Sequence, residues 1–264
     1  RSSDRCHPLF INEAEFFTDV YHLQVFVYED LYLGIAALFH WSGYWPDRKN
    51  QDGLIQPVLA VSRDLRVWDR LNHEVFLPLS PRSASGLHDQ GSLVCTPPVR
   101  RGDELWFYYR GGRYSHLGRD RVKTMCPSGE PDSAVHVARL RLDGFASLNA
   151  GANPGEVTTR PLTISGPQLF VNAAIRAGGT LRAELLDSDG RSLAPFTRDQ
   201  AVPFTGDRTC ARLEWKHGRD FSAMAGRSVR IRFTLQEGDL YAFWMAPEGF
   251  GVAPSGSASD GDQP

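Results

Sequence analysis

The sequence predicts an all-β protein, with β-propeller blades in its first half and an antiparallel β-sandwich in its second half. Short apolar or alternating runs recur along the chain and are separated by clusters of Gly, Pro, Asp and Ser, as in strands joined by turns. The first half holds two similar cycles of such runs, and the second half holds a regular series of short alternating runs. No stretch has the periodicity of a helix longer than two turns.

The composition excludes several classes of protein. The chain has 264 residues, enough for one large or two modest domains, and its 41% of hydrophobic residues allows a packed core. A formal net charge of -2 without a long basic run argues against a nucleic-acid partner. No apolar run has the length of a membrane-spanning helix. We therefore expect neither a nucleic-acid nor a membrane partner, and the oligomeric state stays open.

The first cycle begins with a predicted β-hairpin. Apolar and polar residues alternate over Asp19–Tyr28, and a second apolar strand is predicted over Leu31–Trp41. The acidic pair Glu29-Asp30 interrupts the two runs and predicts the turn. A polar loop is expected over Ser42–Gly53, because glycines and a proline occur there.

The next strand of this cycle ends in a turn with a specific pattern. Val58–Val61 is apolar, and Ser62, Asp64 and Trp68 follow in the pattern S-x-D-L-x-x-W. Ser and Asp side chains bond the backbone of tight turns, and an indole ring can cover such a turn and bury a large area. We expect this stretch to serve the fold. A short apolar continuation, Val75–Leu77, closes the cycle.

The second cycle resembles the first. In chain order it predicts a strand within Gly86–Val99, a turn at Arg101–Glu104, a strand over Leu105–Arg110, a long loop over Gly111–Asp132 and a strand over Ser133–Leu142. Two cycles fit two propeller blades, but two blades cannot close a propeller. Since the chain begins with Arg1 and not with Met, we expect the C-terminal portion of a longer protein with an incomplete propeller. The alternative is a smaller sandwich that is complete in itself.

The pattern changes near Gly151, which predicts a propeller part over residues 1–150, a β-sandwich over 151–250 and a disordered tail over 251–264. The sandwich strands are predicted over Val157–Ile164, Leu169–Arg176, Thr180–Leu186, Thr209–Trp215, Val229–Leu235 and Leu240–Trp244. Gly- and Asp-rich turn signals separate them.

The four cysteines indicate no metal site. Cys6, Cys95, Cys126 and Cys210 are far apart, without a C-x-x-C pair or a histidine in ligand spacing. We expect no metal and no cofactor. Three disulfide pairings are possible, and free or buried thiols are the interpretation that we favour.

Several segments together resemble a known enzyme group. The S-x-D-L-x-x-W turn is similar to the blade turn of five-bladed β-propeller glycosidases of glycoside hydrolase families 32, 43 and 68. The segments ARLRLDGFASL (138–148), LFVNAAIRAGGTLRAELLDSDG (169–190) and VRIRFTLQEGDLYAFWM (229–245) resemble the propeller-to-sandwich junction and the C-terminal sandwich of bacterial family-32-like glycosidases. The resemblance implies a carbohydrate substrate and, because such proteins are commonly exported, a location outside the cytoplasm.

The resemblance also implies two catalytic carboxyl groups, since glycoside hydrolysis uses one carboxyl group on each side of the scissile bond. Glu29, in VYEDLYLG, matches the position of the general acid, although the Cys-Pro that follows that Glu in family 32 is absent. Asp89, in HDQGSLV, is the second candidate. If both serve one site, their carboxyl groups should lie about 5 to 10 Å apart. Each could instead be an ordinary turn residue.

The nucleophile motif of the family, W-x-N-D-P, is absent, as is its R-D-P motif. We therefore predict that this chain lacks a full catalytic set and shows no robust glycosidase turnover. The candidate substrate-binding residues, which could bond sugar hydroxyls or stack on sugar rings, are His40, Trp41, His88, Arg110 and His116. The alternatives are a non-catalytic carbohydrate-binding or structural β protein, and a phosphorylase or transferase. The sugar, the linkage and the stereochemical outcome stay open.

Overall fold

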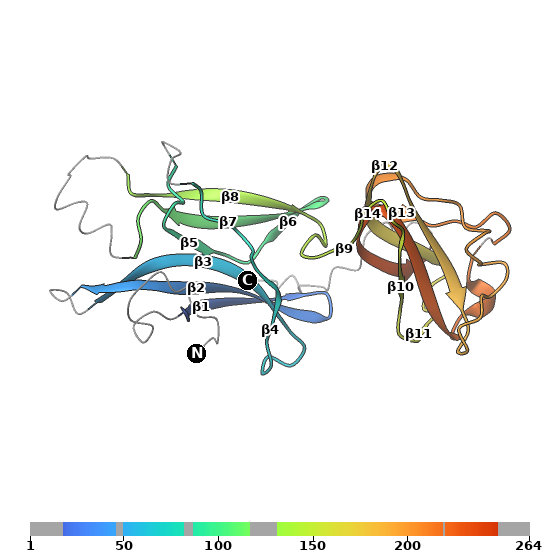
Figure 1. Cartoon of the computed structure of the whole chain (residues 1–264). Coiled ribbons are helices and arrows are strands. Elements are labelled where there is room, and N and C mark those ends of the chain that lie inside the picture. Colours follow the sequence, from blue (N-terminus) through green and yellow to red (C-terminus); the bar gives the residue numbers. More distant parts are fainter. Residues whose placement is uncertain (1–17, 46–49, 82–86, 117–130, 219, 248–264) are drawn as a thin grey trace, which may run out of the picture. The chain divides into compact units, whose positions relative to one another are not determined.

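The computed structural model describes residues 18–45, 50–81, 87–116, 131–218 and 220–247 (Figure 1). The predicted all-β class is confirmed, since the only helical element among these residues is a short 3-10 turn, η1 (Ser222–Met224). The chain divides into two compact units, the first ending at Leu140 and the second beginning at Arg141. Each unit is described by itself below.

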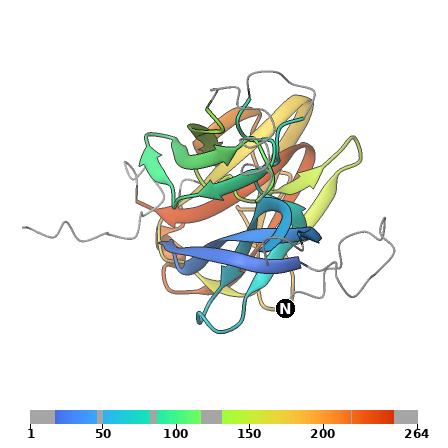
Figure 2. The ribbon, with the colours of Figure 1, turned by 90° about the vertical axis from the view of Figure 1, so that its left-hand side faces the viewer.

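The first unit contains two groups of strands. They are β1 (Thr18–Tyr28), β2 (Leu31–Trp45), β3 (Asn50–Ser62) and β4 (Asp69–Val75), then β5 (Ser92–Cys95), β6 (Val99–Arg101), β7 (Glu104–Gly112) and β8 (Ser133–Arg141). The first four pair in chain order and antiparallel, which is the strand order of a propeller blade. In the second group β7 pairs with β5, β6 and β8. Figures 1 and 2 show the blue strands β1–β3 and the green strands β7–β8 as two layers.

The hairpin predicted around Glu29-Asp30 is present, with Tyr28 paired to Leu31 and Thr18 to His40. The polar loop predicted over Ser42–Gly53 is wrong, because β2 and β3 keep pairing as far as Trp45 and Asn50. One reason is Gly53. A Cβ there would lie 2.2 Å from the carbonyl oxygen of His40, so only glycine lets the two backbones approach this closely. The hydrogen bonds of the ladder outweigh the low strand preference of the polar residues.

The turn at Ser62 has the local structure that the sequence predicts. The Ser62 hydroxyl accepts a hydrogen bond from the Leu65 amide at 2.9 Å, and the Asp64 carboxylate accepts from the Val67 amide at 2.9 Å. The Val67 amide, together with the Arg66 amide that also donates to Asp64, lowers the pKa of this carboxyl group. Trp68 packs against Gly34, where an added Cβ would lie 2.8 Å from its ring. The turn is therefore structural, and β4 follows it directly.

The second unit contains β9 (Leu148–Ala150), β10 (Gly155–Thr158), β11 (Leu162–Thr163), β12 (Gln168–Leu186), β13 (Gly206–Arg212) and β14 (Ser228–Ala246). Its main sheet has the order β10-β14-β12-β13, and the ladders within it are antiparallel. The long strands β12 and β14 pair along most of their lengths, from Gln168–Ala246 to Leu186–Arg230. They form the frame on which the shorter strands lie.

Several strand boundaries in this unit differ from the prediction. The strands predicted over Val229–Leu235 and Leu240–Trp244 form one continuous strand, β14, and the strand predicted over Thr209–Trp215 is β13, which ends at Arg212. The break expected between Leu169–Arg176 and Thr180–Leu186 is absent, because β12 continues through it with a register shift. A Cβ at Gly179 would lie 2.4 Å from the Gln236 carbonyl oxygen, so this glycine marks close strand contact and not a reversal. The single strand expected over Val157–Ile164 is interrupted at Pro161, which has no N–H for the ladder.

The core of the second unit is one continuous apolar cluster. Leu169, Val171 and Leu181 on β12 and Ile231 on β14 have no accessible surface. Aromatic rings are part of this cluster, and Phe196 packs edge-on to Trp215 with 5.4 Å between ring centroids. A cluster of this size is what a unit of this length needs for independent stability.

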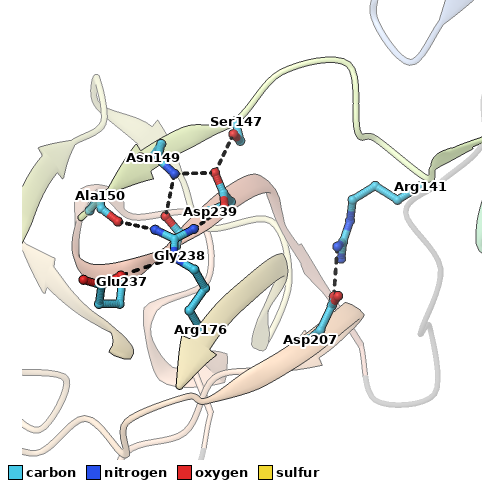
Figure 3. A network of polar contacts seen from close by, with 9 residues as sticks. All are labelled: Arg141, Ser147, Asn149, Ala150, Arg176, Asp207, Glu237, Gly238 and Asp239. Carbon is cyan, nitrogen blue, oxygen red and sulfur yellow. Dashed lines mark hydrogen bonds and ion pairs between the residues drawn. The ribbon is translucent and has the colours of Figure 1, made fainter. Parts of the chain in front are cut away.

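A polar network fixes the start of this unit to its long strands (Figure 3). Arg176 on β12 donates to Glu237 at 3.2 Å, to Asp239 at 3.0 Å and to the carbonyl oxygen of Ala150 at 2.7 Å. It thereby joins β12, β14 and β9. At a separate point the Arg141 side chain donates to Asp207 at 2.8 Å.

Candidate functional site

The candidate site lies at one end of the first unit, where residues from several strands meet. His40 pairs with Thr18 and with Leu54, and the neighbouring Ile55 forms the parallel bridge to Ser92. The segment after β7 returns to this point, because the His116 amide donates to the Gly53 carbonyl oxygen at 2.9 Å. We call this region the Asp89 end and define it by residues 18–21, 39–41, 52–55, 88–92 and 109–116.

Asp89 is the most buried carboxylate of this region, with 8% of its surface exposed. Its Oδ2 accepts a hydrogen bond from the Tyr109 hydroxyl at 3.1 Å. Its Oδ1 is also buried and has no hydrogen-bond donor among the described residues. The Asp89 Cβ lies against Gly111, where an added Cβ would be 2.7 Å from it. An ionisable oxygen that is buried without a donor is costly for the fold, which suggests a functional role.

The phenol that bonds Asp89 has two imidazoles in its neighbourhood. The His136 ring stacks on the Tyr109 ring at 5.1 Å between centroids, and the His88 ring lies 6.5 Å from His136. Burial, followed by the hydrogen bond to Asp89, raises the pKa of Tyr109 to about 12. The phenol therefore stays protonated and remains a donor near neutral pH. The imidazoles provide donors or acceptors according to tautomer.

His116 lies in an aromatic cluster at the same end. Its Nε2 and the Tyr21 hydroxyl are hydrogen-bonded at 3.3 Å. Its ring is 5.5 Å from the Tyr21 ring and 5.2 Å from the Phe39 ring. Tyr21 is 51% exposed, so this cluster combines a solvent-facing ring with polar atoms at its edge. Such surfaces suit ligands that have both apolar and hydroxylated faces.

Asp52 is a second carboxylate at the Asp89 end. Its Oδ1 accepts from the Gly53 amide at 2.8 Å and its Oδ2 accepts from the Ser115 hydroxyl at 3.0 Å. Both oxygens are thus oriented by neighbours. Asp52 is half-buried, in contrast to the buried Asp89.

All five predicted substrate-binding residues lie in the segments that define the Asp89 end, but Arg110 faces away from Tyr109. His40 is hydrogen-bonded to Thr18 at 3.1 Å, and burial lowers its pKa, so its ring is neutral at pH 7. The Trp41 ring lies 6.0 Å from the Phe39 ring, and the positions of His88 and His116 are given above. Arg110 alternates with the buried Tyr109 and is exposed, so the pleat places it on the opposite face of β7.

Glu29 is far from this region. It occupies the exposed turn between β1 and β2 with a φ of 51°, while His40 lies at the other end of β2. From Leu31 to His40 a strand rises ~30 Å. The register therefore pairs the residues of the Asp89 end with the part of β2 around His40 and not with the turn that holds Glu29. A catalytic role for Glu29 in this site has no geometric support.

Sequence reasoning missed several residues that the structure brings to this end or beside it: Tyr21, Asp52, Ser115 and His136. Tyr109 lies on the buried face of β7, in agreement with the alternation along that strand. Asp52 had no such signal, because its partner Ser115 is far away in the chain. Among the described residues, no group of three or more potential metal ligands occurs. No helix in the described part of the chain is long and apolar enough to cross a membrane.

The second unit has an open hollow of about 260 Å³, lined mainly by apolar groups that include Leu148, Phe233 and Phe243. It contains no carboxylate or imidazole. The Asp89 end is therefore the better candidate for a site with polar chemistry.

Comparison with known proteins gave few matches. No family model matches the chain, and no curated protein matches it. Among solved structures, it is similar to a glycoside hydrolase family 43 arabinoxylan arabinofuranohydrolase from Bacillus subtilis in complex with cellotetraose. The identity is 11%, the match covers 85% of this chain and 53% of that chain, and the TM-score is 0.26. The chain thus spans about half the length of that structure. A similarity at this TM-score carries no functional argument, so function is inferred below from the site.

Proposed function

We propose that this protein is carbohydrate-active and that its first unit binds an oligosaccharide at the Asp89 end. The proposed activity is that of a glycoside hydrolase-like protein, which acts on glycosidic bonds through carboxylates. Asp89 is one of these carboxylates. His40, His88 and His116 bond sugar hydroxyls, and the rings around Tyr21 provide an apolar contact face.

The observation that carries the proposal is the state of the Asp89 carboxylate. One oxygen is fixed by Tyr109, and the other is buried without a donor among the described residues. Sugar hydroxyls are strong donors, and a buried charged acceptor gains more from a donor than an exposed one does. The histidines nearby can bond the remaining hydroxyls, because each ring carries both donor and acceptor capacity.

A second candidate is non-catalytic carbohydrate binding. The register that separates Glu29 from Asp89 favours it, since the carboxyl pair inferred from the sequence is not assembled at this end. Both candidates predict ligand binding at the same place, and only the first predicts bond cleavage.

The test is a titration of the 264-residue chain with cellotetraose and with arabinose-substituted xylo-oligosaccharides. Calorimetry and amide NMR shifts monitor the binding. We expect saturable binding with shifts in residues 88–92 and 111–116, and a loss of at least tenfold in affinity for Asp89→Asn. The control Asp103→Asn changes an exposed turn carboxylate and should bind normally. Release of reducing ends then separates the two candidates. Shifts confined to the second unit, or equal affinities of the two variants, would reject the proposed site.

A further inference from the structure

The segment that carries Asp89 is hydrogen-bonded to the strands next to Asp52 and Ser115. The Gly91 amide donates to the Gly112 carbonyl oxygen at 2.9 Å, and the Ile55 amide donates to the Gly91 carbonyl oxygen at 3.2 Å. These bonds hold the segment that carries Asp89 between the end of β7 and the start of β3. Asp52 lies at that start of β3.

Glycines allow this close assembly. A Cβ at Gly91 would lie 2.1 Å from the Tyr114 backbone and 2.6 Å from the Ser115 amide nitrogen. Any larger residue would therefore push residue 91 away from the segment that bonds Asp52. The same segment joins Asp52 on one side, through the Ser115 hydroxyl, and the Asp89 loop on the other.

The two carboxylates differ in their surroundings. Asp89 is buried and has a single phenol donor, whereas Asp52 is half-buried and has both of its oxygens oriented. The partial exposure of Asp52 leaves its carboxylate accessible to a ligand at the same end. This division of roles between a buried and a more polar carboxyl group is common in sites that act on sugars.

We propose that Asp52, oriented by Ser115, is the second carboxylate that contacts the ligand of the Asp89 end. The pair of carboxylates that the sequence suggested for Glu29 and Asp89 is then Asp52 and Asp89. This inference rests on the proposed function, because it concerns the same carbohydrate site. The buried oxygen of Asp89 that has no described donor is the independent observation that points to a ligand there.

The experiment measures binding of cellotetraose and an arabinose-substituted xylo-oligosaccharide to four variants of the full chain: Asp52→Asn, Ser115→Ala, Asp89→Asn and the control Asp103→Asn. We expect about tenfold weaker binding for Asp52→Asn and severalfold weaker binding for Ser115→Ala, which keeps the carboxylate but removes its orienting donor. Ligand-induced amide shifts at Gly53 and Ser115 should disappear in Asp52→Asn. Circular dichroism and thermal unfolding establish that each variant is folded.

The outcomes separate the two proposals. If the unaltered chain binds, Asp89→Asn loses binding and Asp52→Asn binds within twofold of the unaltered chain, Asp52 has no contact with the ligand and only the proposed function stands. If the unaltered chain binds neither oligosaccharide, both proposals are wrong. If Asp52→Asn does not fold, Ser115→Ala decides, because normal affinity in that variant would overturn the role assigned to the Asp52 orientation.

Discussion

The hydrogen bond between Tyr109 and Asp89 gives a prediction whose size follows from the structure. Tyr109→Phe removes the phenol hydroxyl but keeps the ring that stacks on His136. Asp89, which is 8% exposed, then has no side-chain donor within the described part of the chain. Leaving a buried polar group without its partner costs about 1–3 kcal/mol. The unfolding equilibrium constant of the first unit should therefore rise by roughly 5- to 150-fold.

The matched control is Tyr108→Phe, one residue earlier on the same strand. Tyr108 is 36% exposed and lies on the other face of β7, so its change should stay within about 0.5 kcal/mol. The free energies of unfolding are measured in urea by hydrogen exchange of peptides from β5 and β7, because two units can unfold separately. In an Asp89→Asn background the effect of Tyr109→Phe should shrink. Equal effects of the two tyrosine variants would refute the reasoning.

Three further predictions concern the pH dependence of stability, the reactivity of Cys95 and the second unit. Burial raises the pKa of Cys95 to about 12, and burial with the Asp89 contact raises the pKa of Tyr109 to about 12. Since both groups lose their protons earlier in the unfolded chain, the stability of the first unit should be intact below pH 9 and fall between pH 9 and 12. Urea melts at several pH values test this, and a free energy of unfolding that does not change with pH would contradict it. Cys95 should also resist alkylation at pH 8 until urea unfolds the unit, which peptide mass spectrometry can follow. In the second unit, Arg176→Ala should lower the free energy of unfolding by about 1 kcal/mol, because it breaks the hydrogen bonds that link β9, β12 and β14. The control Arg191→Ala removes an exposed ion pair within one turn and should have little effect. Thermal melts of both variants test this.

The local parts of this fold follow from the sequence alone. The turn at Ser62 and Asp64 forms because each side chain bonds backbone amides within a few residues, so its partners are fixed by the chain itself. The hairpin of β1 and β2 follows from an alternating run and an apolar run on the two sides of a short acidic turn. The all-β class follows from the same alternation, repeated along the chain.

Only the tertiary structure shows which residues meet at the candidate site and how far the longest strands extend. Asp52 meets Ser115, and Asp89 meets Tyr109, through the register of distant strands and through glycines that let backbones touch. The same register places Glu29 at the opposite end of β2, a separation that no local pattern contains. The Gly178-Gly179 pair predicts a turn, but the ladder between β12 and β14 continues past it. Hydrogen bonds within a turn depend on residues close in the chain. The meeting of distant residues at the candidate site depends on long-range strand pairing, which composition and spacing do not encode.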